Sequence, residues 1–185
     1  MPNWCNNTLI LTHNDRSELE RAKAAFDRGE LLNEFIPVPE DLKITSSPGT
    51  KDEELKELYA ANIAKHGYDN WYDFCIGKWG TKWDVGGEGD SELALENNIL
   101  TLTFDSAWSP PCGAYEAMEA EGFGVTGYYY EPGMQFAGIY SEGNDDYYED
   151  WGNSEGAREC LPNELDEMFG IADGQEAWEE EDADN

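Results

Sequence analysis

TLILTHNDRSELERAKAAFDRG, residues 8–29, decides the fold class of this chain. It begins with a short run rich in β-branched residues, which is typical of a strand. Asp15, with Glu18 three residues later, matches a capping box at the start of a helix. Apolar residues then recur at helical spacing as far as Gly29, a residue that commonly ends helices. The segment therefore predicts a strand followed directly by a helix.

The rest of the first 141 residues extends this opening into a known order of elements. Four more strands are expected, at residues 82–85, 98–105, 125–130 and 134–140. Ser109, followed by two prolines, fits the N-cap of a second helix between the second and third of these strands. The order predicts an α+β, ferredoxin-like antiparallel sheet, βαββαβ plus an extra strand. With its helices on one face, such a sheet leaves the other face open.

Two segments interrupt or follow this pattern. Residues 37–81 are expected to form an insertion made of a proline-punctuated loop and a helix, capped by Thr50 and ended by Gly67. Residues 142–185 are expected to form an acidic, aromatic-containing extension, with a short helix near residues 161–169 and a solvated, flexible tail. The predicted domains are thus 1–141 and 142–185.

Charge is distributed unevenly along the chain. The whole sequence holds 41 acidic and 11 basic residues, a formal net charge of −30. Residues 1–82 hold ten basic residues against fourteen acids, a net of −4, whereas residues 83–185 hold Arg158 alone against 27 acids, a net of −26. Such a surface repels phosphate backbones and anionic lipid, so we expect no direct binding to nucleic acid or membrane.

Catalysis and metal binding find little support in the residue pattern. The four cysteines and two histidines lack the spacing of a zinc site, and no phosphate loop, dinucleotide fingerprint or G-x-S-x-G motif is present. We therefore expect neither an enzyme nor a cofactor. The N-terminal segment has no basic region followed by an apolar run, and no transmembrane segment is evident, so the expected location is the cytoplasm, with reduced thiols.

Six short sequence motifs, four of which contain Trp, occur in one order: MPNWCNN, FIPVP, WYDF, WGTKWD, FDSAWSPP and YEPGMQFAG. Over residues 1–140 the chain thereby resembles the YubB family of ferredoxin-like domains, which phages and conjugative plasmids encode. The resemblance implies the fold and a mobile-element setting; it brings no catalytic residues. It does not extend to the acidic residues 141–185, where a function special to this chain is expected.

YSEGNDDYYEDWGNSEG, residues 140–156, interleaves acids with aromatic residues. An EF-hand loop started at Asp146 would place Tyr148 at position 3, Trp151 at position 6 and Ala157 at position 12, so this calcium motif is excluded. Rings among carboxylates are instead typical of a contact surface. The candidate partner-binding residues are Glu142, Asp145, Asp146, Tyr147, Tyr148, Glu149, Asp150 and Trp151.

Three functions remain open from the sequence. The first is a non-catalytic inhibitor whose acidic face mimics DNA and occupies the basic surface of a host nucleic-acid-binding protein. The second is a small structural or adaptor domain whose acidity serves solubility. The third is a ligand or RNA binder that uses Trp79 and Trp83 on the open face of the sheet. A continuous acidic surface would favour the first function over the second.

Overall fold

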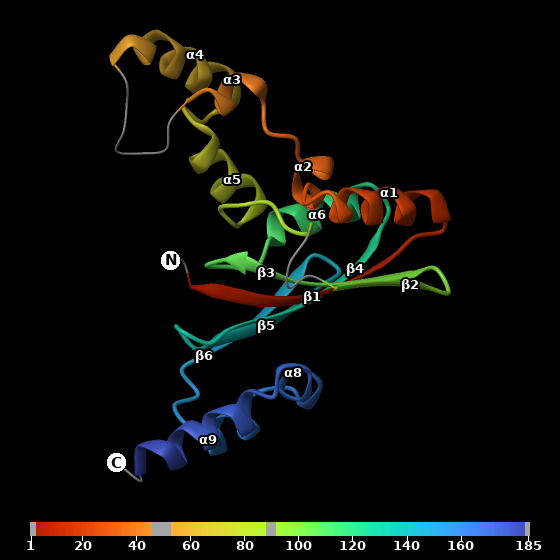
Figure 1. Cartoon of the computed structure of the whole chain (residues 1–185), viewed down its shortest axis with the longest axis vertical. Coiled ribbons are helices and arrows are strands. Elements are labelled where there is room, and N and C mark those ends of the chain that lie inside the picture. Colours follow the sequence, from red (N-terminus) through yellow and green to blue (C-terminus); the bar gives the residue numbers. More distant parts are fainter. Residues whose placement is uncertain (1–2, 46–52, 88–91, 184–185) are drawn as a thin grey trace.

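A computed structural model describes residues 3–45, 53–87 and 92–183 (Figure 1). In chain order the elements are β1 (Trp4–Thr12), α1 (Arg16–Asp27), α2 (Leu31–Phe35), α3 (Glu40–Lys43), the 3-10 turn η1 (Glu53–Leu55), α4 (Lys56–His66), α5 (Trp71–Trp79), β2 (Glu92–Glu96), β3 (Ile99–Ala107), α6 (Cys112–Ala120), β4 (Gly124–Glu131), β5 (Phe136–Ser141), β6 (Asn144–Glu149), α7 (Ser154–Cys160), α8 (Asn163–Phe169) and α9 (Ile171–Ala183).

The predicted α+β, ferredoxin-like fold is confirmed. The strands form one six-stranded sheet in the order β2-β3-β1-β4-β5-β6, and every neighbouring pair is antiparallel. The elements β1, α1, β2, β3, α6 and β4 give the βαββαβ order, and β5 is the expected additional strand. The strand β6 extends the sheet once more and ends it.

The first face of the sheet carries the main core. In β1, every second residue from Cys5 to Leu11 is buried, as expected of a strand with one covered face. Leu9 and Leu11 meet the buried side of α1, represented by Leu19 and Phe26, and that of α6. Figure 1 shows α1, α2, α5 and α6 together on this side of the sheet. The buried side chains of β1 thus determine which face of the sheet these helices cover.

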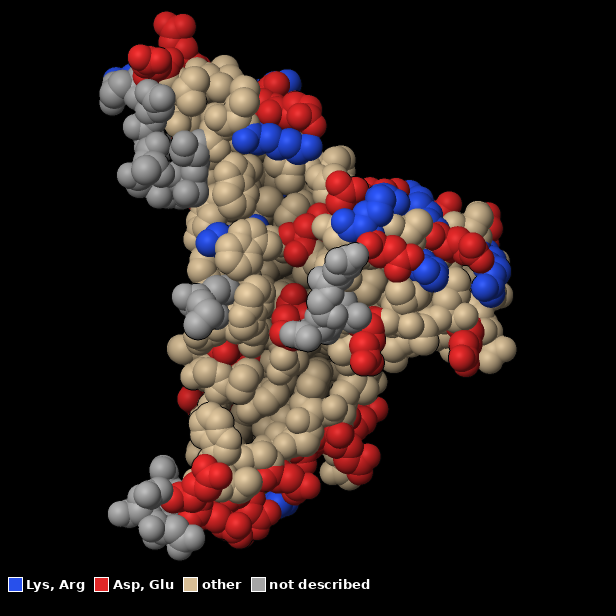
Figure 2. All heavy atoms as spheres, in the orientation of Figure 1, with Lys and Arg blue, Asp and Glu red and all other residues tan. Residues whose placement is uncertain are grey.

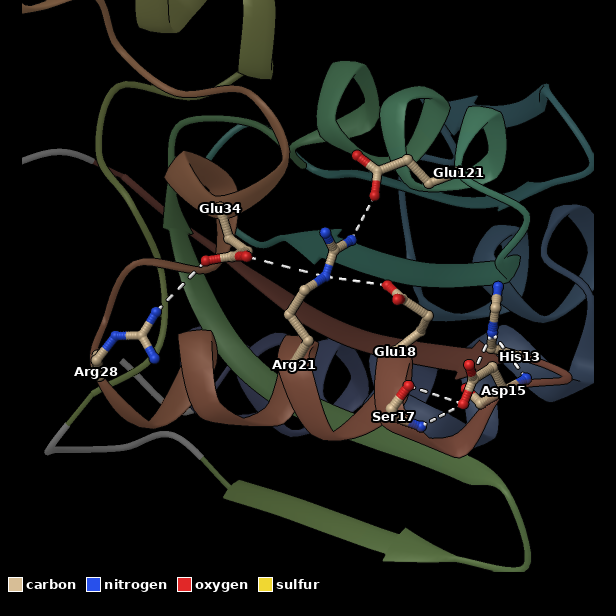
Figure 3. A network of polar contacts seen from close by, with 8 residues as sticks. All are labelled: His13, Asp15, Ser17, Glu18, Arg21, Arg28, Glu34 and Glu121. Atoms are coloured by element: carbon tan, nitrogen blue, oxygen red, sulfur yellow. Dashed lines mark hydrogen bonds and ion pairs between the residues drawn. The ribbon is translucent and has the colours of Figure 1, made fainter.

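An arginine joins three of these helices by their exposed sides (Figure 3). Arg21 of α1 lies 3.1 Å from a carboxylate oxygen of Glu18, pairs with Glu34 of α2 at 3.8 Å and also pairs with Glu121, at the end of α6. Its guanidinium lies 4.8 Å from the centre of the Phe35 ring. These carboxylates raise the pKa of Arg21. The network holds the helical layer together above the sheet.

The second face of the sheet is covered as well, which corrects the expectation of helices on one face. The chain after β6 folds back as α7, α8 and α9 and forms a second core on β4 and β5. Figure 1 shows α8 and α9 on the side of the sheet opposite α1. The expected helix near residues 161–169 is present as α8. The expected flexible tail is instead the helix α9, whose first two residues, Ile171 and Ala172, are buried in this core.

The prediction of a strand at residues 82–85 is also wrong. Asp84 accepts hydrogen bonds from the backbone N–H groups of Leu32 and Asn33, in the first turn of α2, and from that of Val85. Gly86 then adopts a left-handed φ of 97° against Phe26, whose carbonyl oxygen would lie 2.3 Å from a Cβ at this position. This segment is a loop that fixes α2, and the second strand lies at Glu92–Glu96.

In the insertion, Gly67 ends α4 in the left-handed conformation, as predicted, with a φ of 80°. The predicted cap at Thr50 lies outside the described residues. Asn70 then caps α5 by accepting a hydrogen bond from the Asp73 N–H.

Candidate functional site: an acidic layer at the C-terminus

The described C-terminal residues 142–183, comprising β6, α7, α8 and α9, form what we call the acidic layer. It contains sixteen acids and one basic residue, Arg158. Figure 2 shows red carboxylates gathered over the α8–α9 end of the molecule with very little blue, whereas red and blue are interspersed over α1. The charge asymmetry of the sequence is therefore also an asymmetry in space.

A hydrophobic core attaches the acidic layer to the sheet. Trp151, Leu165 and Ile171 are at most 5% exposed and pack with Ala137 of β5. The Trp151 indole N–H donates to Oε1 of Gln175 at 2.9 Å, and the Gln175 amide donates to the Gly152 carbonyl at 3.0 Å. These contacts join α9 to the loop that follows β6. The acidic side chains thus project from a packed support.

Some acids of the layer stabilise it directly. The Glu179 carboxylate accepts from both the backbone N–H and the hydroxyl of Ser154, each at 2.8 Å, at the N-terminus of α7. A carboxylate there is favourable because the first N–H groups of a helix lack partners within the helix. Asp166 accepts from the Ala172 N–H at 2.7 Å, at the start of α9. These two acids hold helices together.

Arg158 is engaged within the layer. Its guanidinium lies 2.9 Å from Asp173 and 2.5 Å from Glu176, both on α9, and these carboxylates raise its pKa. The Asp173 side chain nevertheless stays 88% exposed and that of Glu176 52% exposed. One arginine can balance only a small part of sixteen acids. The layer therefore keeps a strongly negative surface.

The structure divides the eight residues predicted to contact a partner. Five of them lie on β6, where the alternation of a strand sends neighbouring side chains to opposite faces of the sheet. Asp145 pairs in register with Tyr140 of the first core, and Tyr147 and Glu149 share its face. Asp146 pairs with Ile139, and Tyr148 with Ala137, on the face of the second core. These residues are neighbours in the sequence, but they do not form one continuous surface.

The remaining predicted residues lie at the ends of β6. Glu142 and Asp150 have left-handed φ angles of 51° and 60°, in the turns before and after the strand. Trp151 is only 5% exposed, so it supports the layer and cannot be an exposed contact. An ordinary structural role also exists for the acids of β6, because charged residues on an edge strand oppose edge-to-edge pairing with other sheets.

The acids of α9 were missed as site residues by the sequence reasoning. Asp173, Glu176, Glu179, Glu180 and Glu181 were read as part of a solvated tail. The sequence does contain a signal for a helix here, because Ile171 and Gln175 are four residues apart and so share one helical face. Gly170, just before them, ends α8 with a left-handed φ of 60°. The high local charge obscured this pattern.

Neither tryptophan of the alternative ligand- or RNA-binding site, Trp79 or Trp83, lies on a strand of the sheet. Trp79 is 4% exposed, and its indole N–H donates to the Ile36 carbonyl at 2.9 Å, so it is a core residue. Trp83 lies in the loop after α5 and not on a strand. The ammonium of Lys82 lies 4.3 Å from the Trp83 ring centre and 5.2 Å from that of Trp108. A lysine of the chain itself therefore occupies part of the aromatic surface that the ligand- or RNA-binding alternative would use to stack bases.

Within residues 3–45, 53–87 and 92–183, no group of three or more His, Cys, Asp or Glu is arranged to hold a metal ion. In the same part of the chain, no helix combines the length and apolar character needed to span a bilayer.

A scan of the sequence against protein-family models gave no match, and a search of curated proteins gave none either. Among solved structures, the chain is similar to the crystal structure of a protein, api92, from Yersinia pseudotuberculosis, which carries the family designation DUF1281. The two chains share 15% sequence identity with a TM-score of 0.45, and the match covers 81% of this chain and 98% of that chain.

Proposed function

We propose that this chain is a non-catalytic, DNA-mimicking inhibitor that uses its acidic layer to occupy the basic nucleic-acid-binding surface of a host protein. The spacing of charge on α9 carries the proposal. Five exposed acids lie between Asp173 and Glu181. At 1.5 Å per residue they span about 12 Å of helix axis, or about 3 Å per charge. One DNA strand carries one charge per about 3.4 Å.

Rigidity also supports the proposal. A flexible acidic tail must lose conformational freedom when it binds, which reduces its affinity. In α9 the Trp151–Gln175 and Ser154–Glu179 hydrogen bonds hold the acids on a folded support before any partner arrives. A basic channel that follows a DNA backbone can therefore meet carboxylates that are already held on a folded helix.

The setting remains a prediction from the sequence. The resemblance to the YubB family favours a phage or plasmid origin, and hence a target among host defence enzymes in the cytoplasm. The alternative is an adaptor domain whose acidity serves only solubility. The two readings differ in whether the position of the acids matters or only their number.

A charge-matched pair of variants separates these readings. The acidic-layer variant carries Glu159→Lys, Glu167→Lys and Glu180→Lys, on α7, α8 and α9. The control variant carries Glu57→Lys, Glu92→Lys and Glu96→Lys, on α4 and on β2 at the opposite edge of the sheet. All six residues are exposed, and both variants change the net charge equally. Each variant is immobilised and exposed to host lysate at low and moderate salt.

The proposal predicts that the wild type and the control variant capture the same basic nucleic-acid-binding protein, and that the acidic-layer variant does not. Capture should weaken steeply as salt rises, because the interaction is between charged surfaces. Equal capture by the two variants, or a captured protein without a nucleic-acid-binding surface, would contradict it.

A further inference from the structure

A hollow lies beside the edge strand β6, on the face opposite α8 and α9. It has a volume of about 380 Å³ and opens between β6 and the turn that joins β3 to α6. Its lining includes Trp108 and Cys112 of that turn and helix, Tyr129 and Phe136 of the sheet, and Asp145 and Tyr147 of β6. Four aromatic rings therefore share this hollow with a carboxylate.

The four rings are arranged around the hollow, and two of them are exposed. Phe136 and Tyr147 stack with their centres 5.5 Å apart, and Tyr129 meets Phe136 edge-on at 6.2 Å. Tyr147 is 48% exposed and Trp108 40% exposed, so both present ring surface to solvent. Trp108 adopts a left-handed φ of 73°, an uncommon conformation for a bulky residue. Strain of this kind concentrates at functional sites.

A buried tyrosine holds the Asp145 carboxylate in place. The hydroxyl of Tyr129, which is 1% exposed, donates to Oδ1 of Asp145 at 2.7 Å. Among the described residues, Oδ2 of Asp145 receives no hydrogen bond. At the rim, the Tyr147 hydroxyl donates to Glu149 at 3.1 Å, which brings a second carboxylate close. The hollow thus combines ring faces with a fixed acceptor.

Two titratable groups that line the hollow have raised pKa values, first because of burial and then because carboxylates lie close by. Burial, together with the charges of Asp145 and Glu116, raises the pKa of Cys112 to about 12. Burial and the nearby Glu149 and Asp145 raise the pKa of Tyr147 to about 12. Burial disfavours a charge of either sign, but the nearby carboxylates, which oppose a thiolate or a phenolate here, favour a cation.

We propose that this hollow binds the guanidinium group of an arginine side chain. Cations are attracted to aromatic faces, and the exposed Asp145 carboxylate can accept a charge-assisted hydrogen bond from the guanidinium. Arginine suits the geometry better than lysine because its guanidinium is planar, stacks on rings and is more weakly hydrated. Lys82, whose ammonium lies 5.2 Å from the Trp108 ring centre, shows that a cation already settles against this aromatic surface, although it does not line the hollow.

The source of the arginine follows from the acidic layer. Asp145 and Tyr147 belong to β6, which is part of that layer, so a basic partner that docks there brings arginine side chains to this edge. That the arginine comes from such a partner rests on the proposed function. The preference of the hollow for a guanidinium rests only on its own rings and carboxylate.

The test uses two small probes of nearly equal shape on the full chain. N-acetyl-argininamide carries the cation, and N-acetyl-citrullinamide replaces the guanidinium with a neutral urea. Binding is followed by NMR through the indole N–H signal of Trp108. The variants are Asp145→Asn, which keeps an acceptor for Tyr129, and Asp146→Asn, its neighbour on the opposite face of β6.

The expected result is a saturable shift of the Trp108 signal with the arginine probe and none with the citrulline probe. Asp145→Asn should weaken binding by about tenfold, as expected for the loss of a charge-assisted hydrogen bond, and Asp146→Asn should not change it. Equal shifts with both probes, equal behaviour of the two variants, or no saturable shift would overturn the inference.

The outcome is separable from that of the lysate experiment. If the arginine probe fails but capture by the wild type persists, the hollow is excluded and the acidic layer still stands as the binding surface. If the probe binds at Trp108 but no basic partner is captured, the guanidinium site stands and the proposed function fails.

Discussion

Hydrogen bonds made by single side chains fix much of this structure, and Asp84 shows it best. Its half-buried carboxylate accepts from three backbone N–H groups, those of Leu32, Asn33 and Val85. Asp84→Ala leaves these donors unpaired at the N-terminus of α2. We expect a loss of about 1–3 kcal/mol in the free energy of unfolding, measured by urea denaturation. The exposed Glu57→Ala should stay within about 0.5 kcal/mol. A loss of that small size for Asp84→Ala would show that the loop does not hold α2.

Asp84 also makes the free energy of unfolding depend on pH in a defined direction. Burial, opposed by its three hydrogen bonds, raises the pKa of Asp84 above the value of 3.8 for an unperturbed carboxyl. The folded state therefore binds this proton more tightly than the unfolded chain. Its stabilising contribution is present below the unfolded pKa and is lost as pH rises through the folded pKa. The unfolding free energy of the wild type should thus rise relative to that of Asp84→Asn as pH falls from 7 towards 4; a constant or shrinking difference would contradict the raised pKa.

Thiol reactivity is a second test at the residue scale. Cys160 is exposed, whereas burial raises the pKa of Cys75 and Cys112 to about 12 and raises that of Cys5 even further. The thiolate is the reactive form, so these three should react slowly. A colorimetric thiol reagent at pH 8 should therefore detect one fast equivalent in the folded protein and four after denaturation. Fast reaction of Cys112 would argue against the negative hollow beside β6.

Local sequence signals succeeded where one side chain had one local partner. Asp15 caps α1 by accepting from the Ser17 N–H at 2.9 Å, as predicted. The second half of the expected capping box differs: His13 accepts from the Asp15 N–H, and Glu18 turns to Arg21 (Figure 3). Ser109 does not cap α6, because its hydroxyl donates to the Gly80 carbonyl at the end of α5. That bond joins residues 29 apart in sequence, which no local motif can reveal.

At the scale of elements, the central strands and helices could be predicted because their apolar alternation is strong. β1, β3, α1 and α6 each bury a regular face in the first core. The short strand β2 was missed because Leu93 and Leu95 are only partly buried at the sheet edge, between glutamates that resemble a loop. β6 was missed because its acids, such as Asp145 and Asp146, are rare in strands and only pairing with β5 makes it one.

The second core provides the test at this scale. Leu165 of α8 is fully buried against the sheet, whereas Met168 of the same helix is 41% exposed. Leu165→Ala should cost about 2–5 kcal/mol in the free energy of unfolding, because it leaves a cavity in the second core. Met168→Ala should cost far less. Denaturation curves measure both; equal, small losses would mean that the C-terminal helices do not pack on the sheet.

At the scale of the whole molecule, the sequence revealed the charge asymmetry but not the arrangement that gives it a function. The predicted fold left one sheet face open, and residues 142–185 were expected to form a separate extension with one short helix, docked on the core or on a partner, and a flexible tail. The chain instead places α8 against β4 and β5, so the acids of α9 project from a packed layer. The packing of the C-terminal helices on the sheet depends on buried contacts of Trp151 and Ile171 with residues distant in sequence, and the high local charge obscures this pattern.

The central claim is that the acidic layer and DNA compete for one surface on the partner. The direct measurement is a titration of the captured partner, bound to labelled duplex DNA, with this chain. We expect the wild type and the Glu57/Glu92/Glu96 control to displace the DNA completely, and the Glu159/Glu167/Glu180 variant to displace none. A ternary complex, in which the partner holds DNA and this chain together, would contradict it.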